Sequence, residues 1–234
     1  MSETIFASTW AFGEPAVQTA WAWWESEPDL ERAAVAATAA VEMDPTYPTV
    51  GRGGLPNREG VMELDAAFMR GSDLCSGAVA AMRKTLPAID VAYRVATQTN
   101  HLLLAGQGAD DFALAHGFTP QNLLTEKTRA QYEDWRAKVQ RGEIDPDHMV
   151  GHDTIGVLGW HHLSGADTQG ETVACVATSG LGYKRPGRVG DSPLVGAGLY
   201  ADDHGAPVAC TGVGPELLPH ALAVRPLDAI APRC

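Results

Sequence analysis

Two apolar, β-branched segments in the second half of the chain constrain its fold most strongly. They are TIGVLGW, residues 154–160, and TVACVATSG, residues 172–180, and the polar stretch LSGADTQGE at 163–171 leads from one to the other. Two such runs with a polar, glycine-containing turn between them are typical of a β-hairpin. Because helical patterns dominate the residues before them, the sequence predicts a mixed α/β sandwich and not a doubly wound fold.

The rest of the chain supplies further helices and strands. Helical spacing and helix-start signals, among them Pro15 and Pro28 as first-turn prolines, predict helices over residues 14–43, 86–99, 109–117 and 125–142. Strands are expected over residues 4–12, 61–69 and 101–106. Alternation suggests that the second of these strands buries one face, and the run HLLLAG suggests that the third is fully buried.

Composition excludes several classes of partner. The chain has 234 residues, a length typical of one domain over 1–234, and a formal net charge of −12. This charge argues against binding to nucleic acid or to an anionic membrane. The start, MSETIFASTWAF, has no basic region followed by an apolar one, and no apolar run approaches the roughly 18 residues of a spanning helix. We therefore expect a cytoplasmic protein with free thiols at its four cysteines, which form no CxxC pair: Cys75, Cys175, Cys210 and Cys234.

Four histidines surround the junction between a polar loop at 143–153 and the first apolar segment: His148, His152, His161 and His162. A metal site is one interpretation, but the spacing of His152 and His161 matches no compact ligand pattern. Neighbouring histidines on a strand also point to opposite faces. The acidic pairs in GADD (108–111) and YADD (200–203) suit helix starts and turns. We therefore expect no metal and no cofactor.

The dipeptide Asp153–Thr154 at this junction has two further interpretations. Taken alone, it is an ordinary turn before a strand. Alternatively, the Thr154 hydroxyl attacks the carbonyl carbon of Asp153, the amide becomes an ester, and water releases Thr154 as a new N-terminus. The free α-amine can then act as the base for the hydroxyl of its own residue.

A series of motifs decides between these interpretations. In chain order they are STWAF, VGRGGLPNREGVMELDAAFMRG, GAVAAMRKTLPAIDVAYRV, HLLLAGQGADDFALAHGF, GHDTIG and GRVGDSPLVGAGLYADDHGAPVACTG. Together they closely resemble the glycosylasparaginase (aspartylglucosaminidase) family of N-terminal nucleophile hydrolases, over roughly residues 5–215. The resemblance implies a four-layer αββα sandwich. It also implies cleavage into an α piece of residues 1–153 and a β piece of residues 154–234.

The resemblance also assigns roles at the junction and beyond it. It implies that Thr154 is the nucleophile, that the carbonyl of Asp153 is attacked during cleavage, and that His152 belongs to the processing loop. In ATSG, Thr178 supplies a hydroxyl that interacts with the nucleophile. In CTG, Thr211 and Gly212 supply a hydroxyl and a backbone N–H to an oxyanion hole.

Three more residues are implied to bind substrate. Arg188 and Asp191 of GRVGD would hold the free α-carboxylate and α-ammonium groups of an asparagine derivative. A guanidinium fork and a carboxylate suit these two jobs. Trp10 of STWAF corresponds to an aromatic residue near the substrate pocket, although an ordinary buried tryptophan is the alternative. The family further implies a small-molecule substrate and a possible dimer of αβ units.

The last residues depart from the family pattern. CTGVGPE at 210–216 differs from the usual oxyanion segment, and LLPHALAVRPLDAIAPRC at 217–234 resembles nothing later in the family. We therefore expect a sandwich that is incomplete at the C-terminus. Hydrolysis of glycosylated asparagine is the predicted activity. The alternatives are an L-asparaginase or isoaspartyl peptidase with the same nucleophile, and an uncleaved, catalytically silent homologue.

Overall fold

The computed structural model describes residues 2–47, 49–147, 151, 154–162, 170–212 and 218–224. A six-stranded sheet forms its centre, in the order β1-β5-β6-β2-β3-β4. These strands are β1 (Glu3–Ser8), β5 (Ile155–His162), β6 (Glu171–Thr178), β2 (Leu64–Arg70), β3 (Ser76–Met82) and β4 (Leu103–Ala105). Neighbouring strands are antiparallel except β3 and β4, which are parallel.

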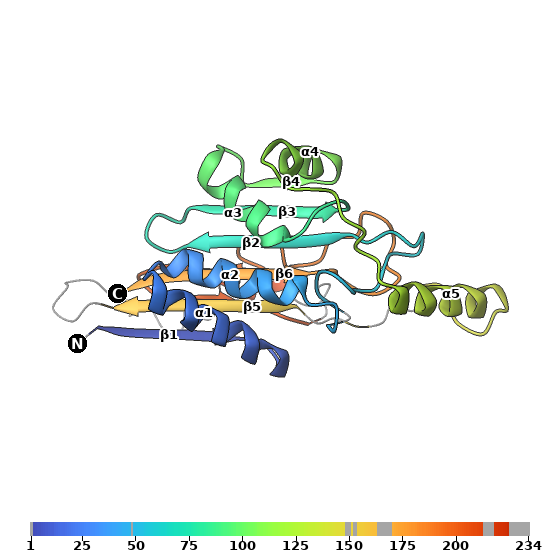
Figure 1. Cartoon of the computed structure of the whole chain (residues 1–234), viewed down its shortest axis with the longest axis horizontal. Coiled ribbons are helices and arrows are strands. Elements are labelled where there is room, and N and C mark those ends of the chain that lie inside the picture. Colours follow the sequence, from blue (N-terminus) through green and yellow to red (C-terminus); the bar gives the residue numbers. More distant parts are fainter. Residues whose placement is uncertain are drawn as a thin grey trace.

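Three helices cover one face of this sheet, and Figure 1 shows them in front of it. They are α1 (Glu14–Ser26), α2 (Leu30–Met43) and α3 (Ala88–Gln98). α2 packs on β5 and β6, α3 packs on β2 and β3, and α1 packs on α2 and β1. The main hydrophobic core lies between these helices and the sheet, and Phe68 and Ile155 are among its fully buried residues.

The opposite face of the sheet carries a small second sheet. β7 (Leu199–Tyr200) and β8 (Val208–Ala209) pair antiparallel and contact β2, β5 and β6. Leu199 and Ala201 pack there against a second apolar cluster that includes Met69 and Val176. The predicted mixed α/β fold is therefore confirmed. The four-layer arrangement and its C-terminal incompleteness stay predictions.

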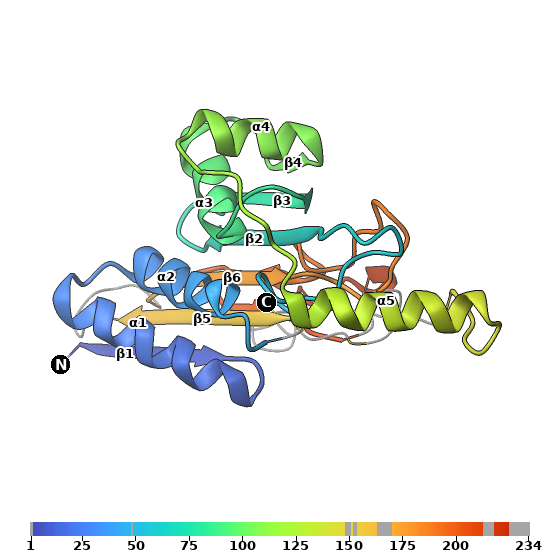
Figure 2. The same cartoon turned by 45° about the vertical axis from the view of Figure 1, so that its right-hand side comes forward.

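Two more helices and two short 3₁₀ turns complete the description: α4 (Gln107–Ala115), α5 (Glu126–Gln140), Ala11–Gly13 and Leu218–His220. α4 lies beside β4, and α5 projects away from the sheet (Figures 1 and 2). α5 is exposed on most faces, as predicted, but its Trp135 is buried and stacks on Tyr183.

Several expected elements need correction. Pro15 lies in the first turn of α1, but Pro28 precedes the Asp29 N-cap of α2 and so lies outside that helix. β2 is buried on both faces, because helices cover one side and β7 the other. The run HLLLAG forms an edge strand, and 69% of the surface of Leu102 is exposed.

The sequence prediction missed β3 altogether. Its residues, SGAVAAM, are small and all buried, so neither alternation nor bulky β-branched side chains indicate a strand. Small residues are needed here because α3 packs closely on the strand. A Cβ atom added at Gly77 would overlap the backbone nitrogen of Ala96 and the carbonyl oxygen of Ala92.

We expect Gly77→Ala to lower the free energy of unfolding by about 3 kcal/mol, because overpacking forces strand and helix apart. Urea denaturation measures this change. Gly108→Ala is the matched control, since Gly108 lies in α4 with open space around it and alanine favours a helix. Equal stability of Gly77→Ala and the wild type would contradict the close packing of β3 against α3.

Candidate active site

Thr154 directly precedes β5 and is buried, with 5% of its surface exposed. The antiparallel register pairs Ile155 with Ala177, so Thr154 lies next to Thr178 at the end of β6. The Thr154 Oγ1 atom is 3.3 Å from Ser192 Oγ. The start of β5 and the end of β6 therefore bring two threonines to the same end of the sheet.

Long-range hydrogen bonds fix the backbone of Thr154. Its carbonyl oxygen accepts a 2.7 Å hydrogen bond from the hydroxyl of Thr9, which in turn accepts one from the backbone N–H of Gly156. The N–H of Thr154 donates to Thr211 Oγ1 at 3.3 Å. The chain around the candidate nucleophile is thus held by two separate segments, those of Thr9 and Thr211.

These contacts surround a small pocket. It is lined by Thr154, Thr178, Gly180, Leu181, Arg188, Gly190, Asp191, Ser192 and Gly212. Thr211 joins it through its hydrogen bond to Thr154. The structure therefore brings together six of the predicted catalytic and binding residues from β5, β6 and the segments after β6 and β8.

Trp10, the seventh predicted residue, contacts the same site from the segment after β1. Its indole Nε1 donates to Thr211 Oγ1 at 3.2 Å. The side chain is 46% exposed, so the alternative of an ordinary buried tryptophan is wrong. Its backbone has a φ of 62°, in a region that non-glycine residues rarely adopt. Trp10 therefore stands at the rim of the site, beside a predicted oxyanion-hole hydroxyl.

Asp191 and Arg188 give the pocket its electrostatic character. Asp191 is 5% exposed, and its buried Oδ2 atom has no hydrogen-bond partner among the described residues. Burial raises the pKa of this carboxyl group, the charge of Arg188 opposes that rise, and Asp65 adds to it. A buried carboxylate oxygen without a partner, close to a guanidinium, is suited to a ligand with an ammonium and a carboxylate group.

The processing residues have no structural test here, because His152 and Asp153 lie outside the described residues. Two further hydroxyls were missed at the sequence level, Thr9 and Ser192. Both stand inside motifs that carried the family resemblance, STWAF and GRVGDSP. The signal was present, but only the folded contacts reveal what these hydroxyls touch.

His161, His162 and the two acidic pairs have structural partners. His161 Nδ1 is 2.9 Å from Thr4 Oγ1 and its ring contacts Trp24, whereas His162 stacks on Trp160. These contacts confirm that the two histidines point to opposite faces. Asp110 accepts hydrogen bonds from the backbone N–H groups of Arg83 and Lys84, and Asp203 accepts from the backbone N–H and side-chain hydroxyl of Thr172. Among the described residues, no three of His, Cys, Asp and Glu cluster as a metal site would require.

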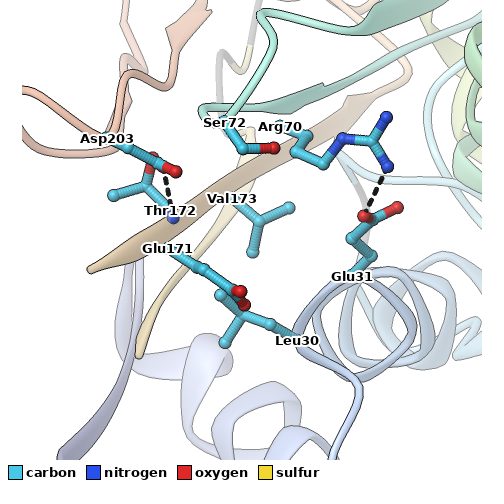
Figure 3. Close-up of a pocket in the computed structure, with 8 residues that line it drawn as sticks. All are labelled: Leu30, Glu31, Arg70, Ser72, Glu171, Thr172, Val173 and Asp203. Atoms are coloured by element: carbon cyan, nitrogen blue, oxygen red, sulfur yellow. Dashed lines mark hydrogen bonds and ion pairs between the residues drawn. The ribbon is translucent and has the colours of Figure 1, made fainter. Parts of the chain in front are cut away.

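A second pocket lies at the other end of β6, and Figure 3 shows its lining residues: Leu30, Glu31, Arg70, Ser72, Glu171, Thr172, Val173 and Asp203. Thr172 and Thr178 are six residues apart on this strand, or about 20 Å. Arg70 forms ion pairs with Glu31 and Asp73 at 2.8 Å, so the charge of its guanidinium is already balanced. This pocket does not adjoin Thr154, and we assign the candidate active site to the pocket at Thr154.

Sequence comparisons identify the family of the chain. A profile of the asparaginase family matches residues 3–230. An N(4)-(β-N-acetylglucosaminyl)-L-asparaginase of Elizabethkingia miricola is 37% identical over 93% of this chain and 61% of its own length. A protein of the same name from Rattus norvegicus is 36% identical over 92% of this chain and 68% of its own length. An isoaspartyl peptidase/L-asparaginase of Bos taurus is 37% identical over 78% of this chain and 57% of its own length.

The fold and the site define the class of this protein. It is a mixed α/β protein with a charged, threonine-lined pocket at one end of the sheet. The chain belongs to the asparaginase family. This confirms the resemblance to glycosylasparaginases drawn from the motifs. The chain spans 61% of the length of the Elizabethkingia relative and 57% of the bovine one. Within the described residues, no helix is both long and apolar enough to span a membrane.

Proposed function

We propose that this protein hydrolyses the side-chain amide of an asparagine derivative, such as glycosylated asparagine, with Thr154 as the nucleophile. One observation carries the proposal. The buried hydroxyl of Thr154 shares a pocket with Arg188 and with a carboxylate oxygen of Asp191 that has no hydrogen-bond partner in the described part of the chain. The names and identities of the relatives support amide hydrolysis at asparagine as the reaction class.

The nucleophile needs a base. Among the described residues, the hydrogen-bond partner of Thr154 Oγ1 is the hydroxyl of Ser192, which is a poor proton acceptor. Cleavage of the bond between Asp153 and Thr154 would supply an amine at Thr154 itself. Its nitrogen already lies 3.3 Å from Thr211 Oγ1, so the new amine would begin in a hydrogen-bonded position.

Cleavage and hydrolysis would use the same hydroxyl in turn. In cleavage, Oγ1 attacks the carbonyl carbon of Asp153, the C–N bond breaks, the nitrogen takes the proton, and water hydrolyses the resulting ester. In hydrolysis, Oγ1 attacks the substrate amide carbon while the α-amine takes the hydroxyl proton and later delivers it to the leaving amine. Water then releases aspartate from the β-aspartyl ester.

The remaining pocket residues have roles that follow from their chemistry. Arg188 would bind the substrate α-carboxylate, and Asp191 would bind the α-ammonium group. The hydroxyl of Thr211 and the N–H of Gly212 would stabilise the developing oxyanion. Thr178, beside Thr154, would interact with the nucleophile, and Trp10 would border the substrate through its contact with Thr211. His152 and Asp153 would belong to the processing loop.

The bovine relative supports a second candidate, an isoaspartyl peptidase or L-asparaginase reaction. It would use the same substrate clamp, by which we mean the pair Arg188 and Asp191. The two candidates differ only in the group that leaves. We expect the cleaved protein to release aspartate from N-acetylglucosaminyl-asparagine faster than from β-aspartyl dipeptides or asparagine, measured by aspartate formation. The reverse order would favour the second candidate.

Blocked substrates serve as the control for this assay. Amidation of the α-carboxylate or acetylation of the α-amine removes one charge that Arg188 or Asp191 would bind. We expect either change to reduce kcat/KM by about 100-fold, because each leaves a buried charged group without its partner. Equal rates for blocked and free substrates would show that the pocket does not recognise the two charges.

A further inference from the structure

A pair of buried charges lies behind the active-site pocket and is not used by the reaction described above. Lys184 Nζ is 3.8 Å from Asp65 Oδ2, and the side chains are 1% and 0% exposed. Neither of these two atoms has a hydrogen-bond partner among the described residues. A buried ion pair with so few hydrogen bonds is a poor source of stability, and apolar residues often replace such pairs without loss. The pair therefore requires another explanation.

Asp65 has a structural task in the sheet. Its Oδ1 atom accepts a 2.7 Å hydrogen bond from the backbone N–H of Ala81. The register between β2 and β3 shifts at this point, and Ala81 has a φ of 51°. A carboxylate or amide oxygen at position 65 thus satisfies a donor that the irregular ladder leaves unpaired.

The same residue lies close to the pocket. Asp65 pairs in register with Thr178, which lines the pocket. Lys184 lies behind Gly180, another lining residue, since a Cβ atom added at Gly180 would be 2.8 Å from its Nζ. The ion pair therefore forms part of the layer beneath the pocket floor.

Charges alternate from this layer to the substrate clamp. Burial raises the pKa of Asp65, whereas the charges of Lys184 and Arg188 lower it and that of Glu63 raises it. Glu63 in turn is paired with Arg83 at 2.6 Å. Besides burial, the charge of Asp65 raises the pKa of Asp191, and the charge of Arg188 lowers it. An uncompensated negative charge at Asp65 would compete for Arg188 and disfavour the ionised form of Asp191.

We propose that Lys184 is a positioning residue that neutralises Asp65, so that Arg188 and Asp191 keep their charges available for the substrate. The inference rests on the proposed function, because it assumes that this clamp binds an α-carboxylate and an α-ammonium group. The sheet requires an acceptor oxygen at position 65, and Lys184 is required because the acceptor present, Asp65, carries a charge near the clamp. Neither side chain touches the reacting atoms.

L-Aspartate carries both groups and is the probe for this proposal. Its affinity is measured by isothermal titration calorimetry on wild type, Lys184→Met and the Lys184→Met/Asp65→Asn double variant, with chain cleavage checked by gel. We expect Lys184→Met to bind L-aspartate at least about tenfold more weakly, because the uncompensated charge of Asp65 then competes for Arg188 and disfavours the ionised form of Asp191. The double variant should bind within about threefold of wild type, because asparagine keeps the acceptor for Ala81 and removes the excess charge.

The readout is the affinity of the folded protein for L-aspartate. A merely structural role of the pair would change the free energy of unfolding but leave this affinity unchanged. Unchanged affinity in Lys184→Met, or a double variant at least about tenfold weaker than wild type, would overturn the proposal. If Lys184→Met does not fold, the affinity of the double variant for L-aspartate decides alone. Affinity within about threefold of wild type supports the proposal, and affinity at least about tenfold weaker overturns it. A wild-type protein that does not bind L-aspartate would instead overturn the proposed function, and with it the clamp that Lys184 serves.

Discussion

Thr154→Ala is expected to leave the 234-residue chain intact and to abolish amide hydrolysis. Wild-type protein should separate on a denaturing gel into fragments of 153 and 81 residues. The alanine variant has no hydroxyl to attack the preceding carbonyl and cannot form the free N-terminal threonine. Removal of a catalytic nucleophile costs on the order of 10⁶-fold in rate where it has been measured, so no activity should remain detectable.

Two variants serve as controls for this result. Thr154→Ser keeps a hydroxyl and should still be cleaved, although more slowly, because it lacks the methyl group that restricts the rotamer of threonine. Thr172→Ala removes another buried threonine hydroxyl, at the opposite end of β6, and should be cleaved like the wild type. A wild-type chain that stays intact on prolonged incubation would reject the proposed mechanism and favour a catalytically silent homologue.

Asp191→Asn is expected to lower kcat/KM by about 100-fold or more for substrates with a free α-amino group. The substitution keeps the size of the side chain and removes the charge that an ammonium group requires. Loss of one partner from a buried charge pair typically costs about 2–5 kcal/mol. Substrates without the α-amino group should be affected much less. Asp111→Asn, at an exposed carboxylate on α4, is the matched control and should behave like the wild type.

The same variant should change the pH profile. Burial raises the pKa of Asp191, against the opposing charge of Arg188 and with a contribution from Asp65. The ionised form binds the ammonium group, so substrate affinity in the wild type should fall as the pH decreases towards this raised pKa. In Asp191→Asn this acidic limb should be absent from a plot of kcat/KM against pH. An identical limb in both proteins would assign the titration to another group.

The sequence predicted the parts of this molecule that local pattern determines. The segments at 154–160 and 172–180 form adjacent antiparallel strands, and the helices α3, α4 and α5 lie where spacing placed them. β3 could not be predicted because close packing by α3 replaces bulky side chains with small ones. The exposure of β4 depends on its position at the sheet edge, which no property of HLLLAG encodes.

The residues of the candidate site divide in the same way, into those that local motifs predict and those that only the tertiary fold reveals. Motifs predicted a common site for Thr154, Thr178, Arg188, Asp191 and Thr211, and the structure brings these residues together. Thr9 and Ser192 stand in the same motifs but have no predicted role, because the function of a hydroxyl depends on its contacts in the folded chain. The contact between Lys184 and Asp65 joins residues far apart in the chain. Such a pairing depends on the tertiary fold and leaves no local trace.

The order of strands has a consequence for the proposed cleavage. β5 and β6 would belong to the second fragment, yet they lie between β1 and β2 of the first. Each fragment alone would expose unpaired strand edges and part of the apolar core, so neither would be a domain in its own right. A cut before Thr154 would therefore divide the covalent chain but not the folded body. The two pieces would stay associated through the pairings of β1 with β5 and of β2 with β6, and through the helices packed across these strands.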